Sequence, residues 1–145
     1  MPPSRRTILV LLGIAAVALI VILILNENGD DGPPAPLSPA ELTELLGAWN
    51  RGNDAFDHFD FKLAESEFSA VAERLPEEPD VWVNIGIAAM NQDNDGAFQR
   101  ARRAFETAIK HDPDHRHANH CAGILMKHLG EFEPAEACFR KVLTS

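Results

Sequence analysis

Histidine and cysteine gather in one short stretch of the chain, and these side chains are the usual ligands of zinc. The stretch reads KHDPDHRHANHC and supplies five such residues: His111, His115, His117, His120 and Cys121. On a helix, His117 and His120 would share a face and His128 would follow two turns later, so the spacing is compatible with a metal site. No acid or second cysteine is placed with them to complete a ligand set. We therefore interpret the cluster as a polar turn and helix wall, and we expect no metal or other cofactor.

Cys121 and Cys138 are the only cysteines in the chain. We expect them on two successive helices, where they could pair if their Cα atoms came within about 7 Å. Both positions also suit small buried side chains. The sequence leaves the paired and the unpaired states open.

Motifs for catalysis are absent from the sequence. It contains no CxxC pair, no CxxCH haem-attachment motif, no glycine-rich phosphate loop and no nucleophile motif. The formal net charge is −9, and an acidic domain repels the phosphate backbone of nucleic acids. We therefore expect neither an enzyme nor a nucleic-acid-binding protein.

An uncharged apolar run lies near the N-terminus. Residues 7–25, TILVLLGIAAVALIVILIL, contain no charge and no proline. As a helix they would extend about 28 Å, close to the thickness of a bilayer core. The alternative is a cleaved signal peptide, which normally has a shorter apolar core and a small-x-small site that LILNENGDDG does not provide. The run therefore predicts an uncleaved transmembrane anchor.

The charges beside this run predict its orientation. Arg5 and Arg6 precede it, and acidic residues follow it. Because positively charged flanks stay in the cytoplasm, we expect residues 1–6 there and residues 26–145 on the periplasmic or extracytoplasmic side.

A linker and a folded domain are expected after the anchor. Residues 26–38 are rich in Pro, Gly and Asp, a composition that favours an extended chain. Ser38 followed by Pro39 is typical of a helix start, with serine as the N-cap and proline at the first helical position. The folded domain is therefore predicted over residues 39–145.

Three segments of this domain share one spacing of small and aromatic residues. Gly52, Gly86 and Gly123 each precede a Phe-x-x-Ala-x-x-x-Phe run. The three runs are formed by Phe61, Ala64 and Phe68, by Phe98, Ala101 and Phe105, and by Phe132, Ala135 and Phe139. Small residues let two antiparallel helices approach closely, and we expect the second Phe to fill the wedge between neighbouring helix pairs. Pro76 and Pro113 would end the second helix of the first two units.

This pattern resembles the tetratricopeptide repeat (TPR) family, in three copies over about residues 45–145. The residues that fit the family's two helices best are Trp82, Ile85, Gly86 and Ala89, followed by Ala101, Phe105, Ala108 and Pro113. The third copy adds Gly130 at the turn between its helices. The resemblance implies an all-α fold, a short right-handed stack of three helical hairpins, with repeats at about residues 45–78, 79–115 and 116–145. We expect helices over residues 40–57, 61–74, 79–91, 96–111, 114–129 and 132–144.

Two departures from the family pattern affect the packing that we expect. The second unit has three extra residues, which fall in the turn Asn91–Gly96. The first unit has Ala48 and Arg51 where large apolar residues are usual, so its first helix is expected to pack less tightly.

In this family the first helix of each hairpin lines a concave groove. The groove residues implied for this chain are Trp49, Asn53, Phe56, Val83, Asn84, Ile87, Met90, His117, His120 and Ile124. Such a groove suits an extended peptide or an amphipathic helix, with Trp49 and Phe56 as anchors. The alternative is that the linker or the start of the first helix fills it.

Some family members hold a C-terminal carboxylate with two Asn and several Lys or Arg. Asn53 and Asn84 match the two Asn positions. Trp49, His117 and Cys121 stand where cationic residues would be, so we do not predict a carboxylate clamp.

The predicted function is a membrane-anchored scaffold that binds another protein in its groove, in an envelope or membrane-associated assembly. No polar capping helix follows residues 132–144, so the apolar face of the last hairpin is expected to be exposed unless a partner, a second copy or further sequence covers it. Self-association through that hairpin is one consequence. The alternative function is an anchor or spacer region whose catalytic or binding part lies on another subunit or in further C-terminal sequence.

Overall fold

The computed structural model of the chain describes residues 37–144. The expected cytoplasmic N-terminus, the anchor at residues 7–25 and nearly all of the linker lie outside the described residues. Within the described part, no helix is both long and apolar enough to cross a membrane.

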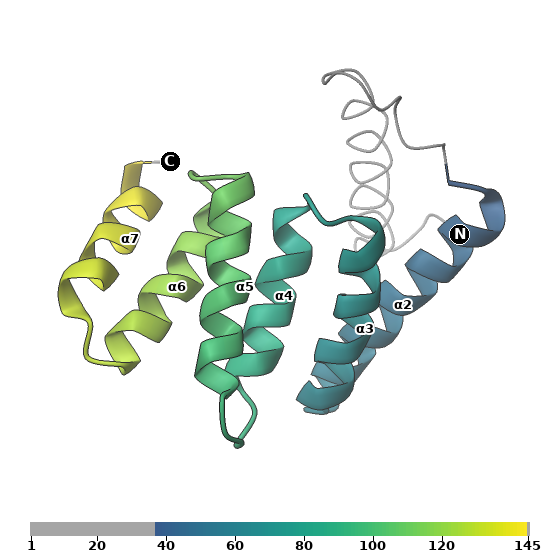
Figure 1. Cartoon of the computed structure of the whole chain (residues 1–145), viewed down its shortest axis with the longest axis horizontal. Helices are drawn as coiled ribbons and strands as arrows, with labels where there is room; N and C mark the ends of the chain where they lie inside the picture. The colour runs from purple at the N-terminus through teal and green to yellow at the C-terminus, as the bar shows by residue number, and fades with distance from the viewer. Residues whose placement is uncertain (1–36, 145) are drawn as a thin grey trace, which may run out of the picture. The chain divides into compact units, whose positions relative to one another are not determined.

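The described residues form one compact all-α unit that begins at Ser38 (Figure 1). Its helices are α2 (Pro39–Asp57), α3 (Phe61–Arg74), α4 (Pro79–Met90), α5 (Ala97–His111), α6 (Arg116–His128) and α7 (Phe132–Thr144). They form three hairpins, α2/α3, α4/α5 and α6/α7, and each hairpin packs on the next through α3 against α4 and α5 against α6. For the described residues the all-α prediction is confirmed, and each helix end lies within two residues of its predicted position.

The start of α2 is fixed by a complete capping box. The Ser38 hydroxyl accepts the Glu41 backbone N–H at 3.3 Å, and the Glu41 carboxylate accepts the Ser38 N–H at 2.8 Å. Pro39 occupies the first helical turn, where its missing N–H leaves no hydrogen bond unmade. Glu41 also accepts a hydrogen bond from Arg74 at the end of α3, so the cap ties the two helices of the first hairpin together.

Each hairpin closes around a glycine and a phenylalanine. A Cβ atom added at Gly52 would lie 2.8 Å from the Phe68 ring, and one added at Gly123 would lie 2.6 Å from the Phe139 ring. Gly86 meets Phe105 still more closely. The prediction for the phenylalanine needs one correction, because the ring first fills the space above the glycine of its own hairpin. Phe105 also packs in one buried cluster with α6 residues such as Leu125, so it bridges to the next hairpin as well.

The second and third hairpins are joined to the preceding turns in the same way. Trp82 Nε1 donates to the Pro76 carbonyl at 2.6 Å, and Asn119 Nδ2 donates to the Pro113 carbonyl at 3.0 Å. Asn119 is almost wholly buried, and this bond satisfies its amide there. The proline that ends one repeat thus offers its carbonyl to the first helix of the next.

The three-residue insertion of the second unit is held by hydrogen bonds. Arg100 Nε donates to Glu65 at 2.8 Å, and the same guanidinium donates to Gln92 and Asn94 of the loop. Gln92 in turn donates to Glu65. This network joins the turn between α4 and α5 to α3 of the preceding hairpin.

Ala48 and Arg51, the two residues of α2 that depart from the family pattern, lie in different environments. Ala48 is buried, whereas Arg51 lies at the surface and donates to Glu67 of α3 at 2.7 Å. α2 packs against α3 and makes at most marginal contact with α4, whereas α4 packs directly against α6.

Candidate protein-binding face

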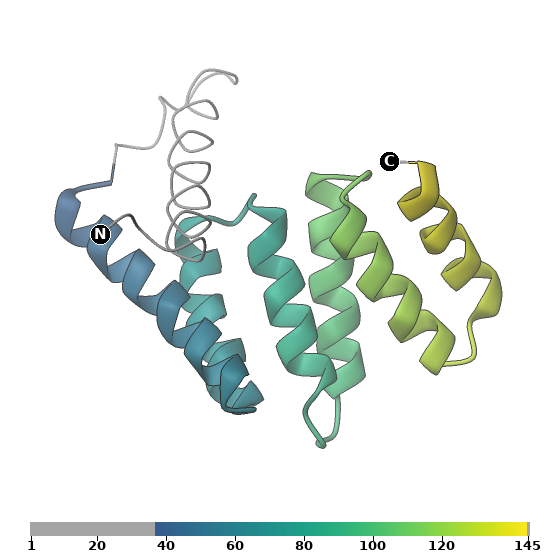
Figure 2. The ribbon, with the colours of Figure 1, turned by 180° about the vertical axis from the view of Figure 1, so that it is seen from behind.

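The ten residues predicted to line a groove all belong to α2, α4 and α6, the first helices of the three hairpins. Figure 2 turns these three helices toward the viewer, in front of α3 and α5. We call this side of the unit the α2/α4/α6 face. Its residues differ in how far a partner could reach them, so they are described helix by helix.

On α2, the two predicted anchors are half-buried rather than free. Trp49 packs edge-on against Phe68, with ring centroids 5.3 Å apart, and Phe56 lies 5.2 Å from the same ring. Asn53 is exposed, and its amide donates to the Trp49 carbonyl at 2.9 Å. Trp49 and Phe56 therefore stabilise the first hairpin and present only their outer edges to a partner.

On α4, one prediction is wrong. Val83 is 0 % exposed and belongs to the main buried cluster, so it is a core residue that no ligand can contact. Ile87 and Met90 are half-buried and pack on that cluster. Asn84 is half-buried as well.

On α6, the face becomes exposed and polar. Ile124 is 40 % exposed, which makes it an accessible apolar side chain of the face. His117 and His120 are exposed beside it, and the His120 ring lies 6.0 Å from Phe139. A partner could contact these three side chains, like Asn53 on α2, without disturbing the core.

His115 of the KHDPDHRHANHC stretch and His128 further along α6 have separate structural contacts. His115 Nδ1 accepts the Ala118 N–H and so caps α6, while its Nε2 lies 3.3 Å from the Asp80 carboxylate of α4. His128 instead lies against Phe98, with ring centroids 4.9 Å apart. Over the described residues, no group of three or more His, Cys, Asp or Glu side chains has the arrangement of a metal site.

Both cysteines are free thiols in the structure. Burial raises the pKa of the Cys121 thiol to about 11, and it also raises the pKa of Cys138. The Cys138 sulfur lies 3.9 Å from the sulfur of Met126. Each thiol acts as a small apolar group in the packing of the third hairpin.

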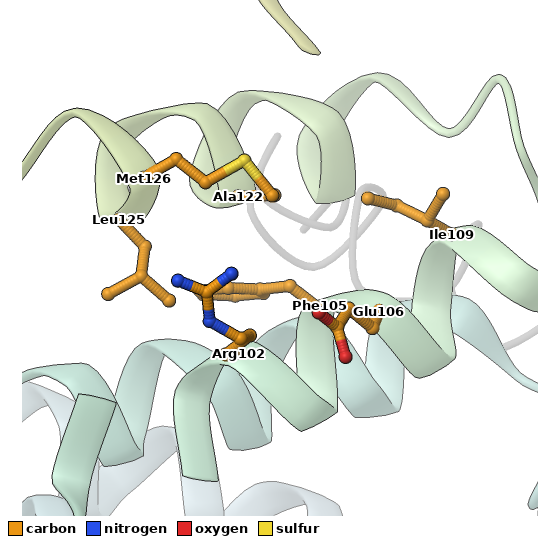
Figure 3. Close-up of a pocket in the computed structure, with 7 residues that line it drawn as sticks. All are labelled: Arg102, Phe105, Glu106, Ile109, Ala122, Leu125 and Met126. Carbon is orange, nitrogen blue, oxygen red and sulfur yellow. The ribbon is translucent and has the colours of Figure 1, made fainter. Parts of the chain in front are cut away.

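One small cavity lies between α5 and α6, away from the α2/α4/α6 face (Figure 3). Its walls are formed by seven side chains: Arg102, Phe105, Glu106, Ile109, Ala122, Leu125 and Met126. Its volume is about 20 Å³, which is room for about one water molecule. We interpret it as a packing gap between two hairpins.

The last hairpin of the described residues leaves apolar side chains uncovered, as expected. Phe132 is 65 % exposed and Leu143 is 85 % exposed. Together with Phe139 they border a hollow of about 440 Å³, which is lined by α7 and by Lys127 of α6.

One exposed aromatic residue was not indicated as a site residue by the repeat pattern. Phe59 is 77 % exposed and lies in the turn between α2 and α3 with a φ angle of 59°. The two comparable turns hold glycine, so only a comparison of the turns, not of the helices, would have singled it out.

Comparisons with known proteins give a fold but no sequence relative. No family model matches the chain, and no curated protein matches it in sequence. Among solved structures, the second TPR domain of Spaghetti (RPAP3), bound to the HSP90 peptide SRMEEVD, is 19 % identical with a TM-score of 0.63, over 70 % of this chain and 91 % of that one. The TPR2B domain of yeast Sti1, in a complex with pHsp70, is 20 % identical with a TM-score of 0.64, over 70 % and 79 %. A mutant of MamA is 23 % identical with a TM-score of 0.60, over 91 % and 87 %.

These likenesses agree with the hairpins and the glycine–phenylalanine contacts described above. The described residues have the fold of a tetratricopeptide repeat domain, and the predicted resemblance is confirmed at the level of the fold.

Proposed function

We propose that the chain is a protein-interaction module that binds a peptide or helix of another protein on its α2/α4/α6 face, without catalysing a reaction. The exposed Ile124, on the same face as the exposed His117 and His120 and the half-buried Ile87 and Met90, is the observation that carries this proposal. Apolar surface rimmed by polar groups is the usual composition of a protein-binding site. The solved TPR domain of Spaghetti carries an HSP90 peptide, which adds support by analogy.

Replacing an exposed apolar residue of the face tests the proposal without disturbing the core. Ile124→Glu places a charge where the partner would bury an apolar side chain, so captured partner should fall by about tenfold or more. Trp49→Ala and Phe56→Ala are weaker tests, because both rings pack on Phe68 and their loss would also destabilise the fold. Binding is measured by pull-down from extracts of the host, followed by titration of the purified partner.

Leu143→Glu on α7 is the matched control, since it places the same charge on an exposed apolar residue of another surface. Binding that survives Ile124→Glu but is lost with Leu143→Glu would reject the α2/α4/α6 face. That result would favour the second candidate, in which the exposed side of α7 attaches this chain to another subunit.

We also propose that residues 7–25 anchor the chain in a membrane and that residues 26–145 lie on the periplasmic or extracytoplasmic side. The uncharged length of the run and the arginines before it support this proposal. An anchored chain stays in the membrane pellet after alkaline carbonate extraction, and protease added from the far side degrades its C-terminal domain. Release of the whole chain by carbonate would contradict the anchor.

A further inference from the structure

Each of the three hairpin turns contains one residue with a positive φ angle. Only in the first turn does this residue have a large side chain. Phe59, Gly96 and Gly130 each lie two residues before the first Phe of their repeat, and their φ angles are 59°, 79° and 79°. A positive φ is open to glycine but strained for residues with a side chain, especially bulky ones. The first turn therefore holds a phenylalanine where glycine would be relaxed.

The first and third turns have the same hydrogen bonds. In the first turn, Phe59 N–H donates to the Phe56 carbonyl at 3.0 Å and Asp60 N–H donates to the Ala55 carbonyl at 2.8 Å. In the third turn, the equivalent bonds are Gly130 to Lys127 at 3.1 Å and Glu131 to Met126 at 2.9 Å. Both are Schellman motifs, in which glycine is the favoured residue. The turn itself thus gives no reason for a phenylalanine.

Core packing gives no reason either. The side chain of Phe59 is 77 % exposed, and its ring meets Phe61 edge-on at a centroid distance of 6.2 Å. The strained backbone opposes folding stability, and the exposed ring contributes little burial to offset it. A contact with another molecule would account for both features.

The Phe59 ring continues the α2/α4/α6 face. Phe61 lies 6.2 Å from Phe59 and 6.3 Å from Phe56, which is one of the half-buried aromatic residues of that face. The three rings form an aromatic strip from the face to the end of the first hairpin. A segment bound on the face could therefore extend over this strip.

Three acidic side chains lie in the same stretch of chain as the strip and outnumber the one lysine there, Lys62. Asp54, Asp57 and Asp60 are all exposed within the same two turns of chain. A hydrogen bond to the Asp54 carbonyl, together with the charges of Asp54 and Asp57, raises the pKa of His58, as expected in a locally negative field. Such a field attracts cationic side chains, an effect that salt weakens.

We propose that the tip of the first hairpin, formed by Phe56, Phe59 and Phe61 with Asp54, Asp57 and Asp60, binds an apolar side chain flanked by Lys or Arg in the partner segment. This inference rests on the proposed function, because it extends the same binding surface and names the chemistry that the surface selects. A basic and apolar segment satisfies both the aromatic strip and the acidic rim.

Peptide binding to the full-length chain in a non-ionic detergent tests the proposal, with empty micelles as the blank. The probe is a labelled peptide of about 14 residues, long enough when extended to cross the face and the tip. It carries one apolar pair in its middle, for the face, and a Leu-Phe pair flanked by lysines at one end, for the tip. A second peptide has the same sequence with glutamates in place of the lysines. Fluorescence anisotropy should show that the lysine peptide binds more tightly and that added salt weakens it. Equal binding of the two peptides would overturn the proposed specificity.

Phe59→Gly separates binding from folding. It should weaken binding of the lysine peptide by about tenfold, because the ring contact is lost. It should also raise the urea midpoint of unfolding, because glycine relieves the strain at a positive φ. Gly130→Phe is the matched control in the equivalent turn, and it should lower the urea midpoint and leave binding unchanged. A lower urea midpoint for Phe59→Gly, or unchanged binding of the peptide, would overturn the proposal.

Ile124→Glu distinguishes this proposal from the proposed function. Loss of peptide binding with Ile124→Glu but not with Phe59→Gly would reject the tip and keep the face. Loss of peptide binding with Phe59→Gly but not with Ile124→Glu would support the tip as a binding site and reject the α2/α4/α6 face as the main one.

Discussion

Three glycines determine how closely the helices of each hairpin approach. Gly52, Gly86 and Gly123 lie directly under the rings of Phe68, Phe105 and Phe139, so no side chain fits between them. The same packing of a phenylalanine ring on a glycine backbone occurs in each hairpin. The ring of Phe105 is almost wholly buried, which places this contact in the centre of the unit.

Gly86→Ala should therefore destabilise the fold, although alanine is the better helix former. Alanine gains about 1 kcal/mol of helix propensity over glycine. Its Cβ would overlap the Phe105 ring, and overpacking of this kind costs about 1–3 kcal/mol. We expect a net loss of stability in urea unfolding, whereas Gly47→Ala in α2, whose nearest neighbour is the mobile end of Arg51, should be neutral or stabilising. Equal stability gains for both variants would contradict the proposed role of Gly86.

The sequence could predict which residues share a helix face, but not how deeply each is covered. Val83 and Ile124 were assigned to one groove by their places in the repeat. Val83 is buried by the main core cluster around α5 and α6, whereas Ile124 remains 40 % exposed. Coverage depends on how neighbouring helices tilt, and that tilt is set by packing across the whole stack. Phe59 was missed because its role depends on backbone conformation rather than on helical spacing.

At the scale of the elements, α2 depends on its N-terminal cap. The backbone N–H of Ser38, its hydroxyl and the Arg74 guanidinium all stabilise the charged carboxylate of Glu41 and lower its pKa from 4.5 to about 2. The same carboxylate completes the capping box. The cap therefore joins local helix formation to the packing of α2 on α3.

This lowered pKa predicts how stability changes with acid. Because Glu41 holds its proton less tightly in the folded chain, its contribution is fully present above about pH 4.5 and is lost as the pH falls toward 2. Glu41→Gln should lower stability at neutral pH and flatten the dependence on pH between 5 and 2. Urea unfolding at a series of pH values measures both effects. A Glu41 carboxyl that titrates near pH 4.5 by NMR would contradict this account of the cap.

Helix boundaries were predictable because their signals are local. Ser38, Pro39 and Pro79 mark starts that the structure places where the sequence indicated. The start of α6 lies two residues later than expected, because Asp112 accepts the Asp114 N–H in a turn and His115 acts as the N-cap. The near-absence of contact between α2 and α4 could not be read from local signals, since it depends on how the first hairpin rests on the second through α3.

At the scale of the whole molecule, the described unit offers two different surfaces. The α2/α4/α6 face combines an exposed isoleucine with polar neighbours, and it continues to the aromatic tip at Phe59. The outer side of α7 is apolar through Phe132 and Leu143. The fold could be predicted from the sequence because the same spacing occurs three times. The choice between the two surfaces could not, because both consist of ordinary helical apolar residues.

Site-specific photocrosslinking in the native host tests the central claim most directly. A photoreactive residue at Ile124, at Asn53 or at His117 should capture the same partner protein, because these positions lie on the α2/α4/α6 face. The same group at Glu106 on α5 or at Leu143 on α7 should capture none of it. Adducts to one partner at all three face positions, and at neither control, are the predicted result. Adducts only at Glu106 or Leu143 would contradict the claim that this face binds the partner.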